Sequence, residues 1–125
     1  MSKLGKVNID ERVLLIRINQ TYFENMSDYD LYNATRGIWK IGERRYSADY
    51  AFAIYKGLIK EVYKIYNWEP ATRYCERLLH WDSDIEGRWQ FNGKVDEDMH
   101  TKYIGKDISD YFKNGNANPV CYINA

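Results

Sequence analysis

The sequence predicts an α+β fold, a small, mixed but mostly antiparallel β pseudo-barrel with short helices. Five or more short apolar segments suit strands, and only two or three segments suit helices. The segments follow neither a βαβ rhythm nor an internal repeat. With 125 residues, 45% of them hydrophobic, and no linker-like stretch, we expect one domain over residues 1–125 with its core between about 12 and 124.

The first predicted strand and helix come early in the sequence. Residues 12–18 (RVLLIRI) are apolar and rich in branched side chains, as a buried strand requires. Ser27 is a predicted N-cap, because two aspartates follow it in the first turn, where the helix dipole favours acids. We expect a short helix over 28–35 with Leu31 and Ala34 facing inward.

Residues 50–66 (YAFAIYKGLIKEVYKIY) form the clearest element, a predicted β-hairpin. Lys56-Gly57 separates two apolar, aromatic runs where a tight turn needs positive φ. A helix is the competing interpretation, but β-branched residues and the central glycine favour the hairpin. Strict alternation predicts two faces in the second run: Leu58, Lys60, Val62 and Lys64 on one, and Ile59, Glu61, Tyr63 and Ile65 on the other.

The segment after the hairpin contains a proline and then a return to strand periodicity. We expect residues 67–70 (NWEP) to end the hairpin, because proline cannot join a central ladder. Residues 71–86 are predicted to be a polar excursion. Residues 87–95 return to period two, with Trp89, Phe91 and Val95 on one side.

Three short elements are predicted in the last thirty or so residues. Residues 96–103 can turn helically. Residues 107–112 suit a short helix ended by Asn114-Gly115. Residues 119–123 (PVCYI) suit a final strand that pairs with the core.

The charges are balanced overall but unevenly distributed. Eighteen basic and eighteen acidic residues give a formal net charge of zero, which argues against non-specific nucleic-acid binding driven by bulk charge. Residues 36–64 hold seven basic and three acidic side chains (+7 − 3 = +4), and residues 81–98 hold two and six (+2 − 6 = −4). The basic segment could bind an anion locally; the alternative is that both segments are simply solvated faces.

Several classes of protein are disfavoured by the apolar segments and the cysteines. No run approaches the ~20 apolar residues of a membrane helix, and the first residues lack the apolar core of a signal peptide. We therefore expect a cytoplasmic protein without a membrane partner. Cys75 and Cys121 match no zinc or redox spacing, so both are expected to be reduced.

The candidate ligand site centres on residues 35–45, TRGIWKIGERR, where one tryptophan lies among four basic residues. An aromatic face with Arg or Lys beside it is the minimum needed to hold a base and its phosphate, and each stacked base contributes about 1–3 kcal/mol. Further rings and hydrogen-bonding side chains come from elsewhere in the chain. The predicted ligand-binding residues are Thr35, Arg36, Trp39, Lys40, Arg44, Arg45, Asn67, Trp68 and Trp89. The alternative is that Trp39 and Trp89 fill the core, with the basic side chains covering surface.

Enzymatic and metal sites have weaker support. His80 and His100 have no carboxylate or cysteine at ligand spacing, and the acidic residues 82–86 lack the positions of a calcium loop. There is no phosphate-binding Walker loop and no GxSxG nucleophile motif. We therefore expect no catalytic residue, no metal and no cofactor.

Four segments together carry a family resemblance: 35–45, 50–71 (YAFAIYKGLIKEVYKIYNWEPA), 87–95 (GRWQFNGKV) and 103–124 (YIGKDISDYFKNGNANPVCYIN). They resemble a group of small bacterial and phage proteins with PUA-like barrels, the broad group that includes EVE, ASCH, YTH and SRA domains. The resemblance implies a pseudo-barrel that recognises a nucleotide or nucleobase, often a modified one, in an aromatic pocket. Gly42 is followed by Glu-Arg-Arg rather than by the ASCH spacing of Gly, Lys and Arg, which disfavours an ASCH-type enzyme.

The function we predict is a non-catalytic module that binds nucleic acid or a nucleotide in an aromatic, basic pocket. One alternative is a protein-protein interaction module of a phage or defence system, which the twelve tyrosines and the zero net charge favour. A second alternative is a small hydrolase on the same fold, with an acid such as Glu43 or Glu61 in its mechanism. The expected partner is accordingly a nucleic acid, a nucleotide or a protein.

Overall fold

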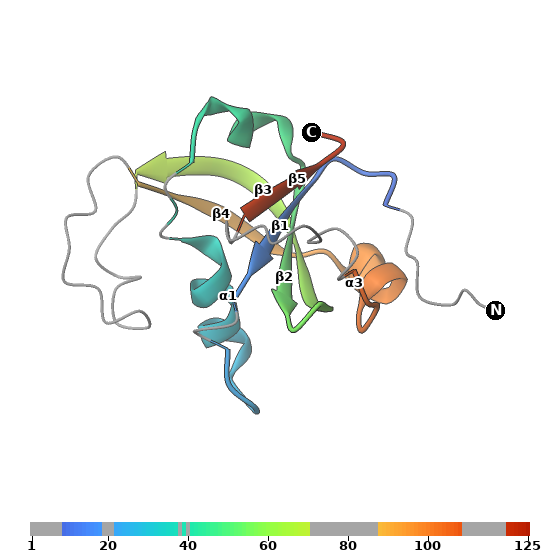
Figure 1. The fold of residues 1–125 in the computed structure, drawn as a ribbon. Coiled ribbons are helices and arrows are strands. Elements are labelled where there is room, and N and C mark those ends of the chain that lie inside the picture. Colours follow the sequence, from blue (N-terminus) through green and yellow to red (C-terminus); the bar gives the residue numbers. More distant parts are fainter. Residues whose placement is uncertain (1–8, 19–21, 38, 40, 71–87, 109–119) are drawn as a thin grey trace.

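The computed structural model describes residues 9–18, 22–37, 39, 41–70, 88–108 and 120–125. Its centre is a five-stranded sheet in the order β4-β3-β2-β1-β5 (Figure 1). The strands are β1 (Val13–Arg17), β2 (Tyr50–Tyr55), β3 (Leu58–Pro70), β4 (Trp89–Val95) and β5 (Val120–Ile123). Among the described strands, only β1 and β2 pair in parallel, and the other three pairings are antiparallel. The predicted α+β class with a mixed, mostly antiparallel sheet is confirmed.

The sheet is not closed into a barrel, so that part of the fold prediction is wrong. Within the described residues, β4 and β5 lie at opposite edges and do not pair with each other. One physical reason lies at β4, whose outer edge is occupied by groups from the segment 32–39 and not by another strand. Side chains and a single bridging residue therefore take the place that a closing strand would have in a barrel.

The segment between β1 and β2 makes one crossover, which the sequence analysis did not predict. Parallel neighbours need a long connection, and here it holds helix α1 (Asp28–Arg36) and the 3₁₀ helix η1 (Glu43–Ser47). The start of α1 is as predicted, because the Ser27 hydroxyl accepts the Asp30 N–H at 3.0 Å. The helix runs to Arg36, one residue further than predicted, and it buries Leu31 and Ala34 as expected.

The hairpin of β2 and β3 is confirmed, but its faces are not. Lys56 and Gly57 both have positive φ, 51° and 81°, as a two-residue turn matched to strand twist requires. The register shifts beside Ala53, which is the mark of a β-bulge. Ile59 and Val62, predicted on opposite faces, consequently belong to the same core cluster.

Residues 67–70 lie beyond the pairing of β2 with β3, as predicted for the end of the hairpin, but they still belong to strand β3, which was not predicted. β3 pairs with β2 only as far as Lys64, and its second half continues to Pro70 alongside β4. Proline is tolerated because it is the last residue of the strand. A second register shift precedes Asn67, and there a Cβ on Gly93 would lie 2.0 Å from the main-chain oxygen of Lys64. Glycine is therefore required at position 93.

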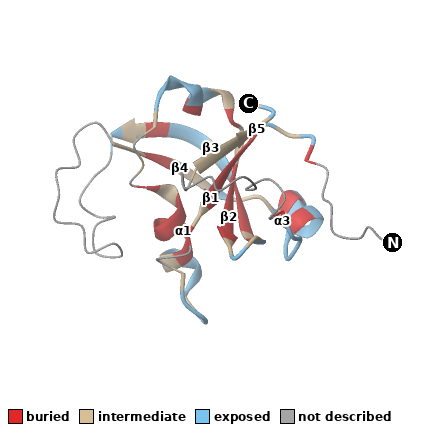
Figure 2. Cartoon of the chain, viewed as in Figure 1, coloured by how far each residue is buried: buried red, intermediate tan, exposed pale blue. Residues whose placement is uncertain are grey.

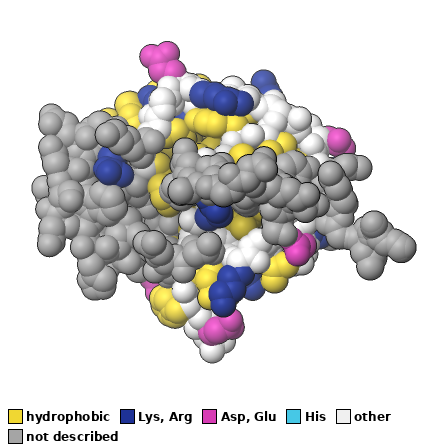
Figure 3. Space-filling view, in the orientation of Figure 1, with side chains coloured by type: hydrophobic (Ala, Val, Ile, Leu, Met, Phe, Trp, Pro, Cys, Tyr) yellow, Lys and Arg dark blue, Asp and Glu magenta, His cyan; other side chains and the backbone are white. Residues whose placement is uncertain are grey.

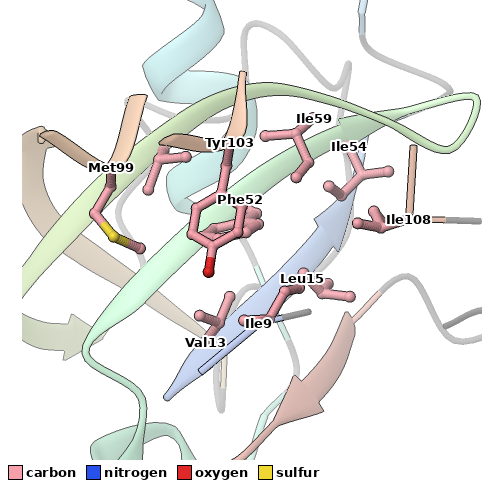
Figure 4. Close-up of a cluster of buried hydrophobic side chains, with 10 residues drawn as sticks. Ile9, Val13, Leu15, Phe52, Ile54, Ile59, Met99, Tyr103 and Ile108 are labelled. Carbon is pink, nitrogen blue, oxygen red and sulfur yellow. The ribbon is translucent and has the colours of Figure 1, made fainter. Parts of the chain in front are cut away.

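Buried hydrophobic side chains form two clusters, and Figure 2 shows buried residues in β1, β2, α1 and α3. One cluster lies under helix α3 (Glu97–Tyr103), which contributes Met99 and Tyr103; Figure 4 shows Tyr103 beside Phe52 of β2. The other cluster lies under α1 and includes Trp68 and Phe91. The sheet is thus covered by a helix on each side, and η1 lies at the top of the view in Figure 1.

The remaining predictions for the C-terminal third have mixed outcomes. α3 is confirmed, with Asp96 as its N-cap, and so is the final strand, which pairs with β1. The helix predicted over 107–112 does not begin at Asp107, which bridges to Leu58, and residues 109–112 lie outside the described residues. The predicted excursion over 71–86 also lies outside them. η1 was not predicted.

Candidate ligand-binding site

The predicted site residues come from four elements, and most of them meet at the start of β4. Thr35 and Arg36 end α1, Arg44 and Arg45 lie in η1, Asn67 and Trp68 lie in β3, and Trp89 opens β4. Trp39 joins α1 to this region, and Lys40 lies outside the described residues.

Trp39 extends the sheet by one residue beyond β4. Its N–H and its carbonyl pair with those of Trp89, at 2.9 and 2.8 Å. Its indole Nε1 donates to the main-chain oxygen of Thr35 at 2.8 Å, and the ring is half-buried against the core under α1. Trp39 is therefore held in place at both its backbone and its ring.

Arg36 is bound on several sides within the fold. Its Nε donates to the Phe91 carbonyl at 2.9 Å, its terminal nitrogen donates to the Asn92 side chain, and Glu69 lies 3.7 Å away. The guanidinium also lies 5.2 Å from the centre of the Tyr32 ring. Only 12% of the side chain is exposed, so Arg36 has little surface left for a ligand.

Glu69 completes this group of polar contacts. Hydrogen bonds from Gln90 and Asn92, with the nearby Arg36 charge, hold the pKa of the Glu69 carboxyl below its usual value. Asn67 accepts a hydrogen bond from Asn92 at 2.9 Å. The predicted base-reading role of Asn67 therefore competes with a contact across β3 and β4.

Two further predicted residues are buried. Thr35 is fully buried, and its hydroxyl donates to the Leu31 carbonyl at 2.8 Å. Trp68 is 9% exposed and packs edge-on against Phe91, with 5.5 Å between ring centres. Its indole nitrogen is buried and has no hydrogen-bond partner in the described part of the chain. Trp68 belongs to the core under α1, and Thr35 is a buried residue of α1 itself.

Arg45 is the unusual residue of the site. It is 4% exposed, and its guanidinium lies 3.7 Å from the centre of the Trp89 ring and 4.4 Å from that of Tyr46. Its terminal nitrogens donate to the Ile41 carbonyl at 3.3 Å and to the Tyr46 hydroxyl at 2.9 Å. Across the described ranges, no carboxylate pairs with it and its Nε has no acceptor. Among the described residues, this buried cation is thus held by rings and neutral oxygens.

Arg44 extends the positive charge to the surface. Its guanidinium lies 4.4 Å from the centre of the Tyr122 ring, and two of its nitrogens donate to the Ala125 main-chain oxygen, at 3.0 and 2.7 Å. In Figure 3, basic side chains lie against hydrophobic ones at the top of the view, where η1 lies in Figure 1. We call Trp39, Arg44, Arg45, Tyr46, Trp89 and Tyr122 the arginine–aromatic cluster.

Three functional candidates were missed by the sequence analysis. Two of them, Tyr46 and Tyr122, belong to the cluster. Tyr46 follows Arg45 directly in the sequence, whereas Tyr122 lies on β5 and only the fold brings it close to Arg44. The third is the pairing of His100 with the buried Glu61, which was predicted as a candidate acid but without this partner; His100 Nδ1 lies 2.6 Å from the Glu61 carboxylate. The pair joins β3 to α3, so no local spacing in the sequence could have indicated it.

Metal sites, membrane-spanning helices and relatives among known proteins were also sought for this chain. Within the described residues, no group of three or more His, Cys, Asp or Glu side chains could hold a metal ion. No helix among them is long and apolar enough to span a membrane. Comparison with protein-family models, with curated proteins and with solved structures finds no match to this chain.

Proposed function

We propose that this protein is a non-catalytic binding module whose ligand is a nucleic acid or a nucleotide, held at the arginine–aromatic cluster. The observation that supports this most is the buried guanidinium of Arg45, which lies on the Trp89 ring without a carboxylate partner among the described residues. Burying a charge without a compensating partner lowers the free energy of unfolding by roughly 3–5 kcal/mol. An anionic ligand would supply the missing negative charge, and rings suit a ligand that also carries a base.

The surroundings of Arg45 favour a ligand with both a flat and a charged part. Tyr46 is 61% exposed and Trp39 is half-buried, so aromatic surface lies beside the buried cation. Arg44 adds a second positive charge at the surface. The resemblance to PUA-like domains also favours recognition of a nucleobase, and membership of that group is part of this proposal.

The test is a ligand titration in which tryptophan fluorescence is the measured signal, because Trp39 and Trp89 lie in the cluster. The probes are short single- and double-stranded DNA and RNA, plain and base-modified, and free nucleotides, each at low and moderate salt. We expect a saturable quench that weakens as salt rises. Arg45→Met should lower affinity at least tenfold without unfolding the protein, because it removes a charge that no carboxylate of the described residues balances.

Arg12→Gln is the matched control, since Arg12 is an exposed arginine paired with Asp49 at 3.1 Å, outside the cluster. It should leave the titration unchanged. A folded protein that responds to none of the probes would contradict the proposal. Equal losses in the Arg45 and Arg12 variants would mean that binding follows overall charge and not the cluster.

A hydrolase, the third hypothesis from the sequence, gains support from the contact between Glu61 and His100. A carboxylate that orients an imidazole leaves the other ring nitrogen available as a general base. The His100 side chain is 39% exposed, so solvent reaches it. Turnover of a phosphodiester or carboxylic ester that is lost in His100→Gln but retained in Arg45→Met would favour this candidate over the binding module.

The protein-interaction alternative rests on exposed aromatic side chains. Phe23, Tyr29 and Tyr66 are each more than half exposed. Scattered apolar residues are common on protein surfaces, so they support this alternative less strongly than Arg45 supports a ligand. Self-association seen by light scattering, together with indifference to every nucleic-acid probe, would favour it.

A further inference from the structure

A second group of cations and rings lies at the hairpin turn, away from the arginine–aromatic cluster. The rings of Tyr22 and Tyr55 pack together with their centres 4.4 Å apart. Lys60 Nζ lies 5.3 Å from the centre of the Tyr22 ring, and Lys56 Nζ lies 5.3 Å from that of Tyr55. Lys56 is exposed and the other three are half-buried, so the group reaches the surface. We call Tyr22, Tyr55, Lys56 and Lys60 the lysine–tyrosine surface.

Both lysines occupy irregular positions of the backbone. Lys56 has a φ of 51°, a left-handed conformation for which two-residue turns prefer asparagine, aspartate or glycine. Lys60 lies in the bulge of β3, where its neighbours Ile59 and Glu61 both pair with β2 and leave Lys60 opposite no residue. Bulges redirect side chains, and strained backbone gathers at functional sites. A lysine at each position therefore indicates a role for the two ammonium groups beyond building the hairpin.

The lysine–tyrosine surface presents positive charge over aromatic faces. Lys60 forms no ion pair with a carboxylate of the described residues. Attraction to the rings holds both ammonium groups in place without neutralising them. Two cations fixed over adjacent rings suit the repeated phosphates of a nucleic-acid backbone. Because the arginine–aromatic cluster also combines cations with rings, one ligand for both surfaces is favoured over an acidic peptide.

The two surfaces lie near opposite ends of β2. In the chain, η1 comes just before β2 and the hairpin turn comes just after it (Figure 1). Tyr22 packs against the same core cluster as Trp39 and Trp89, so both surfaces border the side of the sheet that α1 covers. The six residues of β2 span roughly 20 Å. A free nucleotide cannot reach across that distance, whereas a strand of several nucleotides can.

We propose that the lysine–tyrosine surface is a second contact for a nucleic-acid strand whose other part is held at the arginine–aromatic cluster. Lys56 and Lys60 bind phosphates of the strand, and such contacts do not depend on the base sequence. This inference rests on the proposed function and narrows its ligand to a strand and not a free nucleotide. At ~3.4 Å between successive phosphates of a helical strand, the two surfaces are about six nucleotides apart.

The experiment measures the binding of oligothymidylates of three and twelve nucleotides to the original chain and to the double variant Lys56→Asn/Lys60→Gln. We expect the double variant to bind the twelve-nucleotide strand at least tenfold more weakly and the three-nucleotide strand equally well. For the longer strand, the slope of log affinity against log salt should fall by ~0.7 for each lost phosphate contact. Lys94→Gln, which alters an exposed lysine on β4, is the control and should change neither affinity nor slope.

The outcomes separate this inference from the function on which it rests. If the double variant binds the longer strand as tightly as the original chain does, or loses equal affinity for both strands, the second contact is rejected and the binding module stands. If Arg45→Met leaves the binding of both strands unchanged, the arginine–aromatic cluster is rejected as the first contact. If neither strand and no free nucleotide binds, both proposals fail.

Two further measurements test the choice of ligand and the role of Lys56. If an oligoglutamate of twelve residues binds as tightly as the longer strand and depends on the same lysines, the partner is an acidic protein and the inference is rejected. Asparagine tolerates positive φ better than lysine, so thermal unfolding should find Lys56→Asn at least as stable as the original chain. A less stable variant would mean that Lys56 serves the turn and not a ligand.

Discussion

The Nε–H of Arg36 donates to the main-chain oxygen of Phe91 at 2.9 Å, so a helix-terminal side chain caps the outer edge of a strand. The same edge is capped on either side of this contact. The Gly93 N–H donates to the Tyr32 hydroxyl at 3.0 Å, and Trp89 pairs with Trp39. Alternate residues of β4 thus have their outward main-chain groups engaged, which prevents another chain from adding a strand there.

Arg36→Ala should destabilise the protein. We expect the free energy of unfolding to fall by about 2–3 kcal/mol, because the Phe91 carbonyl and the Asn92 side chain lose a charged donor. Urea denaturation measures the loss, and light scattering should detect association through the uncovered edge. Arg12→Ala, which removes an exposed ion pair, should change stability by less than about 1 kcal/mol. Equal effects of the two changes would contradict the role assigned to Arg36.

Gly93→Ala should be among the most damaging single substitutions. Its Cβ would lie 2.0 Å from the Lys64 main-chain oxygen, and backbone cannot move aside cheaply. We expect a loss of about 3 kcal/mol or more, or failure to fold. Gly42→Ala is the matched control, because a Cβ there meets nothing within 4 Å and φ is −88°. That variant should be neutral or slightly more stable. Similar losses at both positions would show that the close approach is not the cause.

Arg45→Met should have opposite effects on stability and binding. It removes a buried charge that has no carboxylate partner in the described residues, while keeping apolar atoms against the Trp89 ring. The free energy of unfolding should stay level or rise by about 1 kcal/mol, because replacing buried ions by apolar groups is often neutral or stabilising. Parallel urea denaturation and nucleic-acid titration test this. A large fall in stability would mean that Arg45 serves the fold and not a ligand.

The contact of Glu11 with Lys102 and Tyr103 should make part of the stability depend on pH. Burial raises the pKa of the Glu11 carboxyl, but hydrogen bonds from Lys102 at 2.8 Å and Tyr103 at 2.7 Å outweigh this and lower it. A carboxyl with a lowered pKa contributes stability above its unfolded value of about 4.3, and loses it as pH falls through the folded value. Glu11→Gln should therefore flatten the fall in urea midpoint below about pH 4.3. An unchanged pH profile would contradict this assignment.

Local patterns predicted the elements of this fold better than their arrangement. The Ser27 cap and the Lys56-Gly57 turn depend on adjacent residues, and both are as predicted. The bulge that puts Ile59 and Val62 on one face depends on how β3 meets its neighbours, so alternation alone could not show it. The open sheet follows from contacts between α1 and β4, which lie far apart in the sequence.

The site was predicted in part for the same reason. The segment 35–45 does bring Trp39 and two arginines to one region, together with Trp89. The sequence could not show that Arg36 contacts the edge of β4, or that Arg45 is buried with no carboxylate of the described residues beside it, because contacts with distant parts of the chain decide both. Tyr122 entered the cluster only through the pairing of β5 with β1.

The pairing of β1 with β5 also has a consequence during synthesis. Residues 13–16 find their partners at 120–123, so a growing chain on the ribosome exposes one side of β1 until almost every described residue has been made. A strand that waits this long is open to wrong pairing with neighbouring chains. β1 is apolar, so early pairing with β2 reduces its exposure to other chains. After that pairing, only the edge of β1 that later meets β5 is open until β5 has been made.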